Sequence, residues 1–453
     1  MKTYLCFKKP CLHSLPAERR GAIKPESSVL KISILLILIL INGRVVNALP
    51  SYARQTGLSC TACHYSFPEL TPFGRMFKLN GYTMIGVQTI ESTSDSDRVV
   101  RLNLLSTLPL SAFVQASFTN IAKNVPGKQN NSVAFPQQLS VFYAGQVTPH
   151  IGTFIQMTYD GQVFGMDNAD LRYAKQINIK SKSLVYGLTL NNNPAVQDVW
   201  NTSPAWRFPS ATSDAAQNPS KSTIIENLGL QVAGLGAYAL YNNLLFGEFT
   251  VYRSAQQGAA NPADSSSMMA IKGIAPYWRL ALQHQWPDNY IELGTFGIAS
   301  NHFIKGISGI KDSFTDIGID FQYEHTFNTG AFTLHSSLIT EREKRDTIDT
   351  QHINMNFSSF KIDGNLYLKN GLGATVGYFT TSGSTDPVIG SLTGKPNSNG
   401  FIFQLEYLPW YNTKFTLQYI TYNKFDGSIS NYDGAGRNAR NNNTLYLLIW
   451  LNF

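Results

Sequence analysis

The sequence predicts an all-β protein, a closed antiparallel barrel of sixteen strands preceded by a small helical segment. Three observations support this fold class. Strand-like segments of about ten residues recur from residue 99 to the C-terminus. Their connections alternate between two lengths. No apolar run after residue 48 approaches the roughly 20 residues that a membrane-spanning helix needs.

The two kinds of connection give the strand number. Short turns are expected at residues 148–150, 180–182, 242–243, 287–289, 328–330, 370–371 and 411–412. Long polar loops are expected at about 120–137, 160–167, 191–228, 255–273, 301–313, 343–356, 383–399 and 425–442. Seven turns and eight loops make fifteen connections and therefore sixteen strands, an even number, as bacterial outer-membrane barrels have.

Alternating side chains support a barrel with a lipid face and a polar lumen. In the segment 277–286, Leu280 and Leu282 share one face, whereas Arg279 and Gln283 share the other. The chain ends in Phe453, and a final aromatic residue is typical of outer-membrane barrels. A secreted β-sandwich or a propeller is the alternative, but no blade repeat is present.

Residues 1–48 read as a signal peptide. The apolar run 32–41 follows Lys31 and has the length of a signal-peptide core, and cleavage after Ala48 fits a small-residue site. The long stretch before the run indicates a true translation start near residues 29–30. The formal net charge of +7 falls to about +1 without this leader, so nucleic-acid binding is not expected.

The residues Cys60-Thr61-Ala62-Cys63-His64 spell C-x-x-C-H, the attachment signal of a c-type haem. Two thiols bond to the haem vinyl groups, and the adjoining imidazole becomes the proximal iron ligand. We therefore expect one covalent haem c, with Cys60 and Cys63 as its anchors and His64 as an axial ligand. Zinc would lack a fourth ligand of the usual kind, and a structural disulfide or a thioredoxin-like dithiol is the remaining alternative.

Two short helices are expected around this motif. The first carries the motif, with Ser59 at its N-cap and Pro68 stopping it. The second runs from a Thr71 cap to Asn80-Gly81. Phe73, Met76 and Phe77 share a face of this second helix by the i, i+3, i+4 rule and are expected against the porphyrin.

Iron and propionate partners follow from the same segment. Met76 is the expected distal iron ligand, with Met84 as the alternative, or the distal site is open or occupied by a histidine. Arg54, Arg75 and Lys78 are candidate partners of the haem propionates. Residues 49–90, the cytochrome segment, are too few to bury a haem alone, so we expect the barrel to supply a wall, after a linker at 91–98 and with the barrel at 99–453.

The segment resembles the N-terminal signature of the fused monohaem cytochrome–porins, the outer-membrane iron oxidases of iron-oxidising bacteria. The matching pieces are ARQTG at 53–57, C-x-x-C-H at 60–64, P-x-L at 68–70, FGR-x-FK at 73–78 and GY at 81–82. Segments at 139–146, 166–173 and 191–206 are also similar to members of this family. The resemblance spans the mature chain, but its specific motif covers the haem segment only.

The resemblance implies an integral outer-membrane protein that oxidises extracellular Fe(II) through one haem and passes electrons to a periplasmic c-type cytochrome. Such a protein would be an Fe(II):cytochrome c oxidoreductase. One alternative is a transport porin with a structural or sensory haem plug. Another is an electron conduit or peroxidase for a different donor. The haem segment is expected in the barrel lumen or at its periplasmic mouth.

Acidic residues of the outer loops are candidates for contact with the donor, because carboxylates suit a hard cation. They are Asp160, Asp167, Asp170 and Asp198. The loop 191–228 also carries Trp200 and Trp206 and is long enough to fold inward.

Overall fold

The computed structural model describes residues 50–84, 89–91, 103–105, 107–159, 161, 163–255, 270–303, 309–346, 352–387 and 389–453. The expected signal peptide, the expected linker apart from Glu91, and Asp160 lie outside these residues. No helix in the described part of the chain is both long and apolar enough to cross a membrane.

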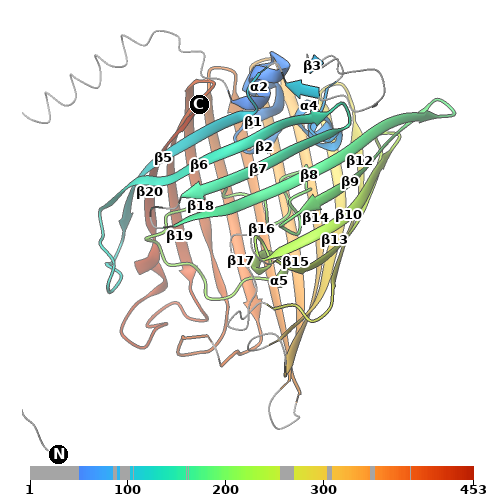
Figure 1. Ribbon diagram of the computed structural model, residues 1–453. Helices are drawn as coiled ribbons and strands as arrows, with labels where there is room; N and C mark the ends of the chain where they lie inside the picture. Colours follow the sequence, from blue (N-terminus) through green and yellow to red (C-terminus); the bar gives the residue numbers. More distant parts are fainter. Residues whose placement is uncertain are drawn as a thin grey trace, which may run out of the picture. The chain divides into compact units, whose positions relative to one another are not determined.

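Sixteen strands form one closed antiparallel barrel, as predicted (Figure 1). Each strand pairs with its neighbours in the sequence, and β20 pairs with β5 to close the barrel. The strands are β5 (Leu110–Ile121), β6 (Ser132–Thr148), β7 (Ile151–Tyr159), β8 (Phe164–Ile179), β9 (Lys182–Asn191), β10 (Val232–Tyr241), β11 (Leu245–Ser254), β12 (Ala275–Gln285), β13 (Asn289–Phe303), β14 (Lys311–Phe327), β15 (Gly330–Asp346), β16 (His352–Leu368), β17 (Leu372–Gly383), β18 (Ser398–Trp410), β19 (Thr413–Lys424) and β20 (Thr444–Asn452).

All seven predicted short turns lie between paired strands, and the long connections lie at the opposite end of the barrel (Figure 1). Local chemistry explains the turns. Asn242 and Asn243, between β10 and β11, have φ of 55° and 50°, the left-handed conformation of tight hairpin turns that Asn tolerates. The predicted loops overlap the strand ends by a few residues; Asp167, for example, lies in β8 rather than in a loop.

Side chains on each strand alternate between an apolar outer face and a packed inner face. On β12, Leu280 and Leu282 are each 53% exposed, whereas Arg279 and Ala281, which alternate with them, are buried. On β20, Leu447 and Ile449 face outward while Tyr446 is buried in the lumen. The predicted alternation is therefore correct, and the barrel has an apolar exterior.

A small segment sits inside one mouth of the barrel, at the end with the short turns (Figure 1). It consists of α2 (Ser51–Thr56), α3 (Cys60–Cys63), β1 (His64–Ser66), β2 (Glu69–Leu70) and α4 (Pro72–Leu79). The short strands β3 (Thr89–Glu91) and β4 (Asn103–Leu105) pair with each other before the barrel begins.

Side chains of this segment bond to the lumen wall. Ser51 Oγ donates to the Ala144 carbonyl at 2.5 Å, and Tyr52 Oη donates to the Thr153 carbonyl at 2.6 Å. Lys414 Nζ of β19 donates to the Phe67 carbonyl at 2.6 Å. The segment therefore lies within the barrel and does not hang below it.

The connection between β9 and β10, residues 192–231, folds into the lumen and is called the inner loop. It contains the short helix α5 (Ile224–Asn227). Trp200 is fully buried and its Nε1 donates to Tyr290 Oη at 2.6 Å. The Ile225 backbone N–H donates to Asp316 Oδ2 at 2.9 Å. The inner loop thus fills the lumen beside β10 to β15.

Candidate haem-binding site

The C-x-x-C-H motif is held by a few local contacts. Helix α3 ends at Cys63, earlier than the predicted stop at Pro68, because His64 already pairs with Leu70 in the β1–β2 ladder. Ser59 is the N-cap residue, but its side chain makes no capping bond. Helix α2 was not predicted from the sequence.

Helix α4 packs directly on the motif. Thr71 caps it as predicted, accepting from the Gly74 N–H at 3.2 Å, and its Oγ1 donates to the Ala62 carbonyl at 2.5 Å. A Cβ atom on Gly74 would come within 2.2 Å of the Cys63 carbonyl oxygen. Gly74 is therefore needed for the close approach of α3 and α4.

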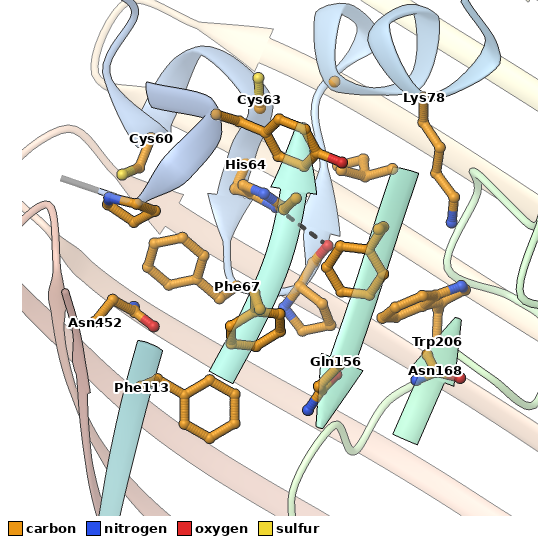
Figure 2. Close-up of a pocket in the computed structure, with 18 of the residues that line it drawn as sticks. Cys60, Cys63, His64, Phe67, Lys78, Phe113, Gln156, Asn168, Trp206 and Asn452 are labelled. Atoms are coloured by element: carbon orange, nitrogen blue, oxygen red, sulfur yellow. Dashed lines mark hydrogen bonds between the residues drawn. The ribbon is translucent and has the colours of Figure 1, made fainter. Parts of the chain in front are cut away.

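A cavity of about 510 Å³ opens beside the motif, between the helical segment, the inner loop and the lumen face of β5 to β8 and β20. Figure 2 shows Cys60, Cys63 and His64 on one side of it, with Phe113, Gln156 and Trp206 across from them. Its volume falls in the range of cofactor pockets, about 300–1,000 Å³.

A series of neighbouring aromatic rings lines this cavity. Neighbouring ring centroids lie 4.9 to 6.4 Å apart, within the usual range for interacting aromatic rings. The series around the cavity comprises His64–Phe67, Phe67–Trp450, Trp450–Phe113, Phe113–Phe142, Phe142–Phe154 and Phe154–Trp206. We define the aromatic belt as the six phenylalanine and tryptophan residues of this series: Phe67, Phe113, Phe142, Phe154, Trp206 and Trp450. Such a lining suits a large flat apolar group.

His64 lines the cavity and has the neutral imidazole that an iron ligand requires. Its Nδ1 lies 3.2 Å from the Pro68 carbonyl oxygen, so a proton on Nδ1 leaves the lone pair of Nε2 available to a metal. Burial lowers the pKa of His64 to about 4, which keeps the imidazole neutral at ordinary pH.

The two thiols have little of the character of a redox dithiol. Both are free, and Cys60 is buried while Cys63 is half-buried. Burial raises the pKa of both, that of Cys63 to about 11. Reactive C-x-x-C pairs depend on a lowered thiol pKa, so this environment does not favour the dithiol alternative. The residues present therefore fit a covalently attached haem.

Neither candidate for the distal ligand lines the cavity. Met76 packs against a buried apolar cluster that includes Trp200 and Phe246, and Phe73 is 41% exposed. Of the three residues expected on the porphyrin face of α4, only Phe77 lines the cavity. Met84 is half-buried and is not part of the lining either. Iron ligation by Met76 or Met84 stays a prediction that these positions do not support.

The three propionate candidates differ in their surroundings. Arg75 is buried, forms an ion pair with Glu324 of β14 and lies 3.9 Å over the Tyr290 ring. Arg54 donates to the carbonyl of Leu110 at the start of β5. Neither lines the cavity, so both cations contact the barrel wall instead.

Lys78 is the one propionate candidate that lines the cavity. Its Nζ donates to the carbonyls of Val196 and Asp198 in the inner loop, at 2.7 and 2.8 Å, and lies 4.5 Å from the Trp206 ring centroid. Burial, and next the Arg172 guanidinium, lower the pKa of Lys78 to about 7.

The candidate donor-side acids also differ in their surroundings. Asp170 is buried and accepts from Arg172 Nε at 2.6 Å and Tyr82 Oη at 2.7 Å. Although burial acts to raise the pKa of Asp198, the nearby Arg279 and backbone N–H groups hold it below its ordinary value. Asp167 is half-buried on the cavity wall. In the described residues, no group of three or more His, Cys, Asp or Glu side chains could hold a metal ion.

Several cavity residues escaped the sequence analysis. Phe113, Phe142, Phe154 and Trp450 come from four strands, β5, β6, β7 and β20. Their lumen-facing position follows from strand alternation, which was the available signal for Trp450 on β20. That these side chains line one cavity depends on the pairing of β20 with β5, which strand alternation does not predict.

No protein-family model matches the chain, and no curated protein matches it in sequence. Among solved structures, the anion-selective porin from Comamonas acidovorans is similar over 76% of this chain and 98% of that one, with 10% identity and a TM-score of 0.46. The outer-membrane channel DcaP of Acinetobacter baumannii is similar over 76% of this chain and 96% of that one, with 12% identity and a TM-score of 0.44.

Proposed function

We propose that this protein transfers electrons across the bacterial outer membrane, from extracellular Fe(II) to a periplasmic c-type cytochrome, through one haem c bound at Cys60, Cys63 and His64. The observation that carries the proposal is the cavity inside the barrel mouth, which is lined by the C-x-x-C-H motif and by the aromatic belt. The resemblance of the haem segment to the iron-oxidase cytochrome–porins supplies the donor and the acceptor.

The outer-membrane location rests on the barrel. A closed barrel satisfies every strand-to-strand backbone bond, and its apolar exterior is suited to lipid. The short turns and the mouth that holds the helical segment would then face the periplasm, and the long loops would face outward.

A bound haem c supplies a one-electron carrier. Each Fe²⁺ that becomes Fe³⁺ releases one electron, and one periplasmic acceptor takes it up. The thioether bonds from Cys60 and Cys63 would fix the group in the mouth, and His64 would bind its iron. Lys78 would stand beside its propionates as a cation, and the aromatic belt would exclude water from its faces.

Anaerobic mixing of the oxidised holoprotein with Fe(II) tests this proposal. The haem absorbance is expected to change to the reduced form, and a soluble c-type cytochrome added afterwards is expected to reoxidise it. Reduction by dithionite without any reduction by Fe(II) would contradict iron as the donor. That result would favour the conduit for another donor.

The porin-type barrel favours a second candidate function, a channel whose haem is a structural or sensory plug. The inner loop and the helical segment both occupy the lumen, so a wide pore of general specificity is not what these contacts suggest. Planar-bilayer conductance of the purified protein tests this candidate, because a diffusion porin would give steady single-channel currents.

A further inference from the structure

The cavity wall opposite the motif carries a small network of polar side chains from β6, β7 and β8. Thr158 Oγ1 donates to Asp167 Oδ2 at 2.9 Å. The Nε2 group of Gln156 lies 3.2 Å from the hydroxyls of both Ser140 and Thr158. The Nε2 group of Gln138 lies 3.4 Å from the same two hydroxyls. The two amide groups and the Thr158 hydroxyl therefore donate to neighbouring side chains of the wall.

The acceptor oxygens of the same side chains differ from the donors, because some of them have no partner in the wall. Gln156 is 8% exposed and lines the cavity, and within the described part of the chain its Oε1 has no hydrogen-bond partner. Gln138 Oε1 and Asp167 Oδ1 likewise have no partner among the described residues. All three residues line the same cavity as Cys60 and His64, and Figure 2 shows Gln156 there. The wall thus presents two amide oxygens and one carboxylate oxygen.

The other two candidate carboxylates already accept hydrogen bonds from the protein at both oxygens. Both oxygens of Asp170 accept bonds, from Arg172, Tyr82 and Thr189. Both oxygens of Asp198 accept bonds from the backbone of the inner loop. Among the described strand residues that line the cavity, Asp167 is the only charged one.

We propose that Asp167, Gln138 and Gln156 form an oxygen-lined subsite on the cavity wall across from the C-x-x-C-H motif, where a divalent cation is held next to the bound haem. Oxygen ligands suit hard divalent cations. One carboxylate and two neutral amides bind such an ion weakly, as release after electron transfer requires. The subsite rests on the proposed function, in which the cation is Fe²⁺.

Binding of Mn²⁺ tests the subsite without electron transfer. The full holoprotein in detergent micelles is titrated with Mn²⁺, and the free ion is measured by its electron paramagnetic resonance signal. Asp167→Asn keeps the shape and removes the charge, and is expected to weaken binding about tenfold, or ~1.4 kcal/mol. Asp288→Asn, in the exposed turn between β12 and β13, removes the same charge outside the cavity and should leave this binding unchanged.

A second variant changes the affinity in the other direction. Gln138→Glu adds a carboxylate to the half-buried edge of the subsite and is expected to tighten Mn²⁺ binding. Equal Mn²⁺ affinity in the wild type, Asp167→Asn and Gln138→Glu would overturn the subsite. This second variant keeps the test decisive even if Asp167→Asn does not fold.

Reduction kinetics connect the subsite to the donor. At low Fe(II) concentration, Asp167→Asn is expected to slow haem reduction by Fe(II) about tenfold, in line with the weaker binding, while reduction by dithionite stays unchanged. Normal reduction by Fe(II) in this variant would overturn the subsite and leave the proposed function standing. Failure of Fe(II) to reduce the wild type would overturn the proposed function, and the Mn²⁺ titration would still decide the subsite.

Discussion

The two halves of the lumen are built differently. Beside β10 to β15, the wall and the inner loop meet through buried charges: Arg279 forms ion pairs with Asp320, with Glu292 at 3.3 Å and with Asp198 at 3.6 Å. Beside β5 to β8 and β20, the wall presents aromatic rings and amides around a cavity. The first half is filled by the chain itself, whereas the second leaves room for another group.

This difference shows how one side of a barrel lumen can be filled by the chain while the other side keeps a cavity. Buried ion pairs gain little over apolar packing, but they demand one geometry, and here they fix the inner loop against one wall. The loop then presents Trp206 and Asp198 toward the opposite half. The half that contains Arg279 would therefore set the shape of the cavity in the other half.

Removal of the two thiols is expected to have the largest effect, and to affect only the half of the lumen that contains the cavity. Cys60→Ser with Cys63→Ser removes both anchors, so covalent haem should be abolished, while the ion-paired half keeps the barrel closed. Haem fluorescence in a denaturing gel measures the first effect, and heat-dependent migration of the barrel measures the second. Covalent haem in the double variant would contradict the attachment site.

Arg279→Met is expected to have the next largest effect. It leaves Asp198, Glu292 and Asp320 buried without their cation, and breaking such a group typically costs about 3–5 kcal/mol. Urea unfolding in micelles, followed by tryptophan fluorescence, measures the change. Arg253→Met, at an exposed position near the end of β11, is the matched control, and equal midpoints for the two variants would contradict the role of the buried ion pairs.

Lys78 links the two halves and is expected to make the haem potential depend on pH. Its pKa of about 7, set by burial and Arg172 against Asp170, Asp198 and Glu248, means that it loses its charge as the pH rises through neutrality. A nearby positive charge favours the reduced haem, so the potential should fall with rising pH, by at most about 59 mV per pH unit for one electron. Spectroelectrochemistry of Lys78→Gln should show a flat profile in this range; an unchanged slope would contradict the assignment.

The smallest expected effect concerns the helix that carries Lys78. Thr71→Ala removes the N-cap of α4 and should cost about 1 kcal/mol. Thr71→Ser keeps the capping oxygen and serves as the control. Faster proteolysis of the helical segment in the alanine variant only is the expected result, and identical digestion of both variants would speak against the capping role.

The barrel was predictable because its signals are local. A hairpin turn such as Asn242-Asn243 depends on the conformations open to those two residues, and the alternation of Leu280 and Arg279 depends on the pleat of one strand. Strand number and turn positions followed from such features alone. The C-x-x-C-H motif is equally local, because the chemistry of haem attachment fixes the spacing of Cys60, Cys63 and His64, and haem attachment there stays a prediction.

The rest of the site was not predictable, because it depends on distant partners. Helical spacing grouped Phe73, Met76 and Phe77, but contacts with the wall and the inner loop decide that Phe77 and Lys78 line the cavity and that Met76 packs elsewhere. The sequence did not distinguish the candidate donor-side acids Asp167, Asp170 and Asp198 from one another. Arg279, 81 residues after Asp198 in the chain numbering, is one of the groups that separate them.

The pairing of β20 with β5 has a consequence for the order of assembly. Trp450 and Asn452, near the end of the chain, line the same cavity as Cys60, which lies far earlier in synthesis. The pocket around the motif is therefore complete only once β20 has paired with β5. Until that strand docks, the motif is open on one side, and afterwards it is walled in.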